Sequence, residues 1–125
     1  MKKIHIVEDQ MIIAMDLQFM LEDMGYVVSN LSSSYEETFE KIKLDPPDLL
    51  ILDIILKTDK TGIDIAHELN LNYQIPFVFL TSHADLLTVE AAQATNPRGY
   101  LVKPFNHSDM SKVLAEAFGE SKQEE

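Results

Sequence analysis

The stretch Leu49-Leu50-Ile51-Leu52-Asp53, entered from Pro46-Pro47-Asp48, decides the fold of this chain. Four large apolar residues in succession predict a strand buried on both faces, which is typical of a parallel sheet covered by helices. The carboxylate of Asp53 would then emerge from the sheet at a fixed and partly desolvated point. A single aspartate at a strand end is more often a turn or helix cap, so the role of Asp53 depends on the residues that accompany it.

Short apolar runs and longer amphipathic stretches alternate along the rest of the chain. Helix signals are the stop at Gly25, the capping-box pattern of Ser34 and Glu37, and an i, i+3, i+4, i+7 apolar stripe that begins at Met110. Strands joined by helical crossovers run parallel, with helices on both faces of the sheet. The alternation therefore predicts an α/β three-layer sandwich, with strands near residues 4–7, 26–28, 49–52, 77–80 and 100–102 and a fourth helix near residues 85–95.

Length and composition set the outer limits. A chain of 125 residues, 46% of them hydrophobic, predicts one domain over residues 1–119, followed by a polar tail or the start of a linker over 120–125. No apolar stretch reaches the roughly 20 residues of a membrane span, and the basic start is too short for a signal peptide. The absence of cysteine excludes disulfides and agrees with a cytoplasmic location. The net charge of -11 argues against nucleic-acid binding.

Polar side chains lie directly after the expected strands, at the point where each one ends. Glu8-Asp9 comes after the first strand, Asp53 after the third, Thr81-Ser82 after the fourth and Lys103-Pro104 after the fifth, whereas the second is expected to end in the uncharged Ser29-Asn30. The carboxyl ends of parallel strands meet at one edge, where ligands gather. Taken singly, Glu8-Asp9 is explained as a helix cap, Thr81 as a strand-end cap and Lys103 as a solvated charge.

Together these residues indicate a site for a cation and a phosphoryl group. Three clustered carboxylates would repel one another and raise one another's pKa values unless a cation neutralised them. Oxygen ligands without histidine or cysteine favour Mg2+, with Mn2+ as the alternative. The ammonium of Lys103 and the hydroxyl of Thr81 are suited to phosphoryl oxygens.

In their order and spacing, these residues resemble the receiver domain of bacterial two-component response regulators, over essentially residues 3–118. The motif that carries the resemblance consists of Glu8-Asp9, Asp53, Thr81 and Lys103-Pro104-Phe105. The resemblance implies a flavodoxin-like (βα)5 fold with strand order 2-1-3-4-5, a role in phosphorelay signalling, and Asp53 as the phosphoacceptor.

The resemblance also implies the role of each residue at the site. Magnesium would be bound by Asp9, Asp53, the main-chain carbonyl of Ile55 and Glu8, the last directly or through water. The phosphoryl group would be contacted by Thr81, Ser82 and Lys103, and the Lys103-Pro104 peptide bond would be cis.

Two further roles are implied by the same resemblance. Thr81 and Tyr100 would form a switch that reshapes the surface of the fourth helix, fifth strand and fifth helix; otherwise Tyr100 simply covers a sheet edge. Ile55 and His83 would flank the path of the water that hydrolyses the phosphorylated aspartate. An aliphatic side chain cannot orient a water molecule, whereas His83 could either orient it or shield the bond through a hydrogen bond. We expect a phosphorylated state that lives longer than in chemotaxis-type regulators.

The implied partners are a sensor histidine kinase or a histidine phosphotransfer domain, together with an effector domain or a downstream protein. The first helix, with exposed candidates at Met11 and Met15, and the loop after Lys103 would form the docking surface, although apolar residues there could equally belong to the core. A phosphorylation-dependent homodimer through the fourth helix, near Leu86 and Leu87, is also open.

Other classes compete with this interpretation. Glu8-Asp9 would repel the phosphate of a flavin-binding module, and Ile55 occupies the place where a phosphatase of the haloacid-dehalogenase type needs a second aspartate. A degenerate receiver that only binds proteins is the main alternative, although none of the acids is missing. We expect no enzyme activity beyond self-phosphorylation and slow autodephosphorylation. His5, His67 and His107 are expected to be strand or surface residues.

Overall fold

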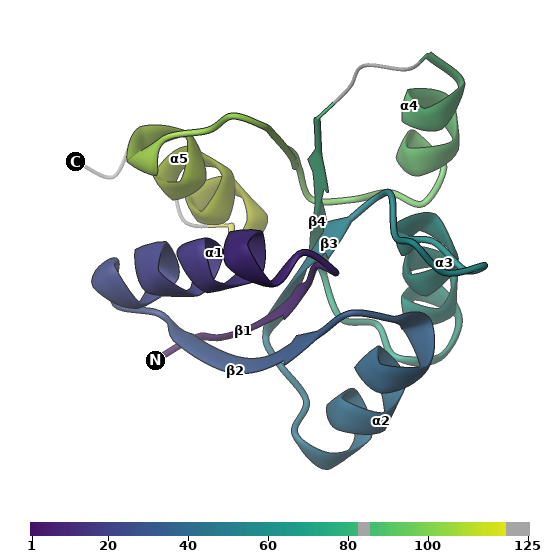
Figure 1. Ribbon diagram of the computed structural model, residues 1–125, viewed down its shortest axis with the longest axis horizontal. Helices are drawn as coiled ribbons and strands as arrows, with labels where there is room; N and C mark the ends of the chain where they lie inside the picture. The colour runs from purple at the N-terminus through teal and green to yellow at the C-terminus, as the bar shows by residue number, and fades with distance from the viewer. Residues whose placement is uncertain (83–85, 120–125) are drawn as a thin grey trace.

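The structure is a computed structural model that describes residues 1–82 and 86–119 (Figure 1). Five parallel strands form one sheet in the order β2-β1-β3-β4-β5, which confirms the predicted fold. The elements are β1 (Lys3–Val7), α1 (Met11–Asp23), β2 (Val27–Ser32), α2 (Tyr35–Leu44), β3 (Leu49–Asp53), α3 (Gly62–Asn72), β4 (Phe77–Thr81), α4 (Leu86–Gln93), β5 (Tyr100–Val102) and α5 (His107–Ala117).

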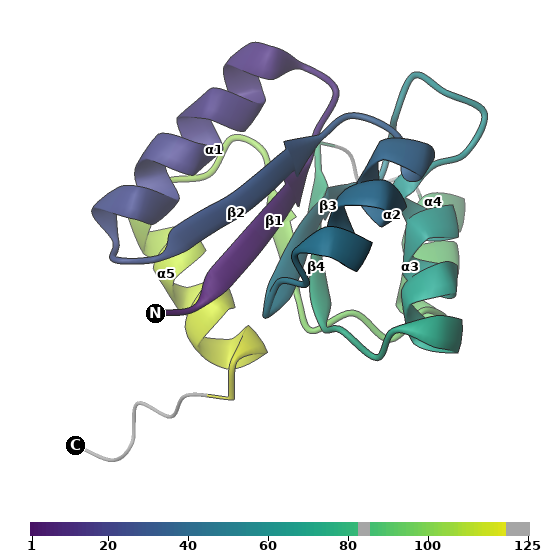
Figure 2. The same ribbon diagram turned by 90° about the horizontal axis from the view of Figure 1, so that it is seen from below.

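The helices cover both faces of the sheet, as the crossover rule requires. Helices α1 and α5 lie on one face, and α2, α3 and α4 lie on the other (Figures 1 and 2). All five residues of β3 are buried. Leu50 and Leu52 belong to the core cluster beneath α2 and α3, whereas Leu49 and Ile51 belong to the cluster beneath α1 and α5. The uninterrupted apolar run therefore contributes side chains to both core clusters, because successive strand residues point to opposite faces of the sheet.

Local capping fixes where the helices begin and end. Gly25 has φ 95° and stops α1, as predicted. At the start of α2 the Ser34 hydroxyl accepts the N–H of Glu37, as predicted, but the Glu37 carboxylate accepts the N–H of Ser33 and not that of Ser34, so the predicted capping box forms only in part. Two complete capping boxes, from Thr61 to α3 and from Asn106 to α5, were not expected from the sequence. Each orients a loop that leaves the carboxyl edge of the sheet, so these caps also position the candidate site.

The predicted end of the second strand is wrong. The strand does not stop at Ser29-Asn30 but continues to Ser32, because its pairing with β1 shifts by one residue between Ile4 and His5. This bulge keeps β2 hydrogen-bonded along the full length of β1.

The fourth helix also ends earlier than expected, at Gln93. His83 and the predicted tail 120–125 lie outside the described residues. Within the described part of the chain, no helix has both the length and the apolar character to cross a bilayer.

Candidate functional site

The acidic residues singled out from the sequence meet at the carboxyl edge of the sheet. Glu8 and Asp9 come directly after β1, and Asp53 is the last residue of β3. Each offers a carboxylate oxygen, and these three oxygens lie within 4.8 Å of one another. Asp53 is only 6% exposed and Glu8 only 3%. Carboxylates from two strands are therefore crowded together in a largely desolvated place.

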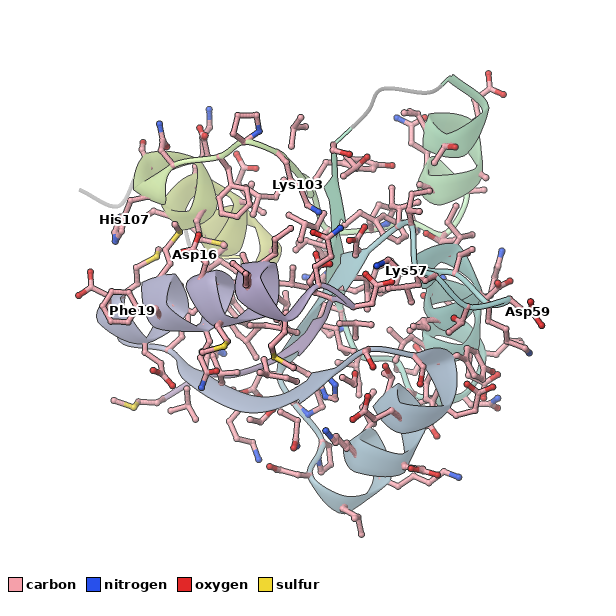
Figure 3. All side chains as sticks on the ribbon, viewed as in Figure 1. Asp16, Phe19, Lys57, Asp59, Lys103 and His107 are labelled. Carbon is pink, nitrogen blue, oxygen red and sulfur yellow. The ribbon has the colours of Figure 1, made fainter. Side chains whose placement is uncertain are left out.

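Among the described residues, the ammonium group of Lys103 faces this acidic cluster. Lys103 Nζ lies 3.4 Å from Glu8 Oε1 and 3.4 Å from Asp53 Oδ2. Lys103 enters from the loop after β5, whereas Lys57 belongs to the loop after β3, and the two are labelled in Figure 3. A single positive charge cannot balance three carboxylates. Burial, followed by the hydrogen bond with Asp53, raises the pKa of Glu8 from 4.5 to about 7.

This donor set fits a hard divalent cation. Three clustered carboxylate oxygens with an excess of negative charge are the ligands that Mg2+ prefers, and the described residues place no histidine in the cluster. A cation here would stabilise the charged form of Glu8 and so oppose the effect of burial, which raises the pKa of this carboxyl. Within the described part of the chain, the side chains of Asp9, Asp53 and Glu8 could together hold such an ion.

Backbone hydrogen bonds orient the carboxylates. The N–H of Ile55 donates to Asp53 Oδ1 at 3.0 Å, so that Asp53 Oδ2 faces Lys103. The N–H of Lys57 donates to Asp9 Oδ2 at 2.7 Å. These contacts tie the loop between β3 and α3 to the acidic cluster. The role of Lys57 was not predicted from the sequence, because a main-chain donor carries no residue-type signal.

A close backbone approach also supports Asp53. A Cβ atom at Gly62 would lie 2.1 Å from the carbonyl oxygen of Asp53, so only glycine lets the start of α3 approach the end of β3 this closely. The N–H of Gly62 donates to the carbonyl of Ile54 at 3.0 Å. This glycine was not singled out from the sequence, although its position at a loop-to-helix boundary is a usable signal.

The predicted hydroxyl and switch residues lie on or directly after β4 and β5, the two strands beyond β3 in the sheet. Thr81 ends β4, and its carbonyl accepts the N–H of Lys103 at 2.8 Å, while Ser82 is exposed. The peptide bond between Lys103 and Pro104 is cis, as predicted. The ring of Tyr100 stacks on Phe79 with centroids 6.0 Å apart. Its hydroxyl is buried without a hydrogen-bond partner among the described residues, and burial raises its pKa.

Apolar side chains are exposed on α1 and on the loop after β3. Ile55, whose N–H donates to Asp53, is 63% exposed. Met11 and Met15 are exposed on α1, as expected, and Ile12 and Phe19 extend the same apolar surface. Figure 3 labels Phe19, which points away from the body of the domain.

Known proteins are similar to this chain in sequence. The family model that describes the response regulator receiver domain matches residues 4–115 of this chain. The transcriptional regulatory protein PdtaR of Mycobacterium tuberculosis is 36% identical over 113 residues, which cover 90% of this chain and 55% of PdtaR. The phyllosphere-induced regulator PhyR of Methylorubrum extorquens is 30% identical over 118 residues, covering 92% of this chain and 43% of PhyR. The chain thus spans about half the length of these relatives.

Solved structures agree with these matches. The signal receiver domain of a modulated diguanylate cyclase from Desulfovibrio desulfuricans G20 has a TM-score of 0.88 at 31% identity, with 100% of this chain and 99% of that one covered. The chemotaxis protein CheY4 of Vibrio cholerae has a TM-score of 0.84 at 26% identity, with 94% and 98% covered. Because the family match extends over nearly the whole sheet and its acidic edge, the chain belongs to the response regulator receiver domain family.

Proposed function

We propose that this chain is the phosphoacceptor receiver of a two-component system, and that Asp53 takes a phosphoryl group from a phosphohistidine. The observation that carries the proposal is the buried Asp53 carboxylate, clustered with Glu8 and Asp9 and faced by Lys103 at 3.4 Å. The donor would be a sensor histidine kinase or a histidine phosphotransfer domain.

The described contacts suggest how the chain would carry out the transfer. A carboxylate oxygen of Asp53 attacks the phosphorus as the bond to the histidine nitrogen breaks, and the product is an acyl phosphate. Lys103 neutralises charge on the transferred oxygens, and the Thr81 and Ser82 hydroxyls donate to them. Mg2+, when bound, neutralises further charge on the phosphoryl group. Asp9, Asp53, the carbonyl of Ile55 and Glu8, the last directly or through water, would hold the ion.

The switch is proposed to use Thr81 and Tyr100. The new dianion on Asp53 would draw Thr81 inward and change the packing of Tyr100, and with it the surface of α4, β5 and α5. The buried Tyr100 hydroxyl, which lacks a partner among the described residues, supports two positions for this ring, because an unpaired buried hydroxyl is costly. That surface would then act on an effector domain, a downstream protein or a second copy of the chain.

Phosphorylation can be tested directly. Incubation with Mg2+ and beryllofluoride, or with a small phosphodonor, should shift the amide resonances of the loops at the carboxyl edge. Asp53→Asn should abolish the response. Asp59→Asn, which removes an exposed carboxylate from the loop after β3, is the matched control and should respond like the unmodified chain. A response that survives in Asp53→Asn would overturn the assignment.

The same experiment distinguishes this proposal from the main alternative, which is a degenerate receiver that only binds proteins. The presence of all three acids and the lysine argues against loss of function. A chain that binds neither Mg2+ nor beryllofluoride would leave the interaction module as the correct description.

The phosphorylated state is predicted to be long-lived. Ile55 is exposed beside Asp53, and its aliphatic side chain cannot orient an attacking water molecule. His83 would be the second residue on the water path. Dephosphorylation should therefore be faster in Ile55→Asn, whereas Ile55→Leu should match the unmodified chain. Equal rates for Ile55→Asn and the unmodified chain would refute this explanation.

The chain would act as a signalling domain in the cytoplasm, with residues 1–119 as the receiver and 120–125 as a polar tail or linker. It would not process a separate substrate. The acidic net charge of -11 gives no support to direct nucleic-acid binding, although PdtaR is named a transcriptional regulatory protein.

A further inference from the structure

A buried chain of hydrogen bonds runs from β1 through β2 to α2. His5 and Thr38 are fully buried and Ser32 is 4% exposed. His5 Nε2 lies 2.8 Å from Ser32 Oγ, which lies 2.7 Å from Thr38 Oγ1. Figure 2 shows β1 and β2 side by side, with α2 on the side of the sheet opposite α1. Three elements are therefore joined by polar side chains where apolar packing would otherwise be expected.

The direction of each hydrogen bond is set by the last one. Thr38 Oγ1 lies 2.7 Å from the carbonyl oxygen of Ser34, and it must donate because a carbonyl only accepts. Its single hydrogen is then committed, so Thr38 accepts from Ser32, and Ser32 in turn accepts from His5. His5 must therefore carry its hydrogen on Nε2. Its Nδ1 is buried without a hydrogen-bond partner among the described residues, as an unprotonated nitrogen.

The hydrogen-bond chain lies next to the bulge that lengthens β2. Ile4 is opposite Val28 but His5 is opposite Asn30, so that Ser32 comes to lie opposite Val7. Without the shift, Leu31 would occupy that place, because a slip of one residue turns every side chain to the other face. The hydroxyl of Ser32 can reach His5 and Thr38 only in the bulged register.

The main chain of Ser32 also contacts Glu8, the first residue of the acidic cluster. Its carbonyl accepts the N–H of Glu8 at 3.0 Å. Ser32, Glu8 and Asp9 line the same cavity of ≈ 290 Å³. The register of β2 thus sets where the backbone leaves β1 and where the carboxylates of Glu8 and Asp9 are presented.

We propose that Ser32 is a positioning residue for the metal site and that the neutral, Nε2-protonated His5, together with Thr38, holds it in register. The effect on a metal site rests on the proposed function, whereas the hydrogen-bond chain does not depend on it. Ser32 acts through the backbone of Glu8 and touches neither the cation nor the phosphoryl group.

Two matched pairs of variants test this role. Ser32→Ala removes the central hydroxyl, and Ser111→Ala removes an exposed hydroxyl from α5, away from the pairing of β1 with β2. Thr38→Val removes the terminal hydroxyl at constant shape, and Thr38→Ser retains it. Mg2+ affinity, measured by amide shifts, should fall about tenfold in Ser32→Ala and Thr38→Val and by less than about twofold in the two controls. Hydrogen exchange at the Glu8 amide should accelerate in Ser32→Ala and Thr38→Val alone.

Each outcome decides the inference. Equal Mg2+ affinity and equal Glu8 exchange in Ser32→Ala and Ser111→Ala would overturn it. If Ser32→Ala fails to fold, the Thr38 pair and the imidazole nitrogen shifts of the unmodified chain still decide, and a proton on Nδ1 of His5 would refute the hydrogen-bond chain. If the unmodified chain does not bind Mg2+, the proposed metal site is overturned. Hydrogen exchange at the Glu8 amide needs no metal, so it would still test whether Ser32 positions Glu8.

Discussion

Acidification should destabilise this fold through His5. Burial, and then the positive charge of Lys41, lower the pKa of His5 from 6.5 to about 4, while Glu37 and Asp45 oppose the shift. Between these values the unfolded chain binds a proton that the folded chain does not. The free energy of unfolding must therefore fall as the pH falls through this window. The buried Nδ1 without a partner among the described residues explains why a charged imidazole is poorly accommodated.

The size of the effect can be worked out from the two pKa values. The difference between 6.5 and about 4 corresponds to about 3 kcal/mol once His5 is protonated in both states. About 2 kcal/mol of this should appear between pH 7 and pH 5. Glu8 acts in the opposite direction, because its raised pKa of about 7 gives stability at low pH that is lost as the pH rises. The contribution of His5 must therefore be measured as a difference between variants.

Urea unfolding monitored by circular dichroism, at a series of pH values, isolates that difference. His5→Gln retains a donor for Ser32 but does not titrate, so the unmodified chain should lose about 2 kcal/mol more than this variant between pH 7 and pH 5. His67→Gln, which replaces an exposed histidine on α3, is the matched control and should behave like the unmodified chain. Parallel stability curves for the unmodified chain and His5→Gln would refute the reasoning.

Three other substitutions test the packing around the site. Gly62→Ala would place a Cβ 2.1 Å from the carbonyl oxygen of Asp53; it should cost about 1–3 kcal/mol in urea unfolding and weaken Mg2+ binding, whereas Gly99→Ala, with only ordinary contacts, should do neither. Asn106→Ala removes the cap of α5 and should cost about 1 kcal/mol; unchanged thermal unfolding would contradict this. Phe79→Ala empties a fully buried site and should cost about 3–5 kcal/mol; a loss below about 1 kcal/mol would show that the core collapses to fill the space.

The fold could be predicted because its signals are local. The run Leu49–Leu52 has no polar residue, and a strand of this kind is stable only when both faces are covered. Glu8, Asp9, Asp53 and Lys103 could be found from their positions at the strand ends, since parallel topology brings those positions together. The cis peptide before Pro104 was expected only from the family resemblance, and the structure has it.

Other features depended on contacts that leave no local pattern. The end of β2 was misplaced because the bulge opposite His5 is set by pairing between strands, and the alternation of Val27–Ser32 does not reveal it. The close approach of Gly62 to Asp53 depends on where α3 meets the sheet. The main-chain donor of Lys57 was invisible for a similar reason, since every residue other than proline has an N–H.

The sequence by itself therefore determined the order of elements, the buried strand β3 and the residue types at the carboxyl edge, because apolar periodicity and strand-end position are properties of short segments. Only the tertiary structure decided the distances within the acidic cluster, the raised pKa of Glu8 and the buried hydrogen-bond chain from His5 to Thr38. Desolvation and hydrogen-bond direction arise only when segments distant in the sequence are brought into contact, and they cannot be read from any one of those segments.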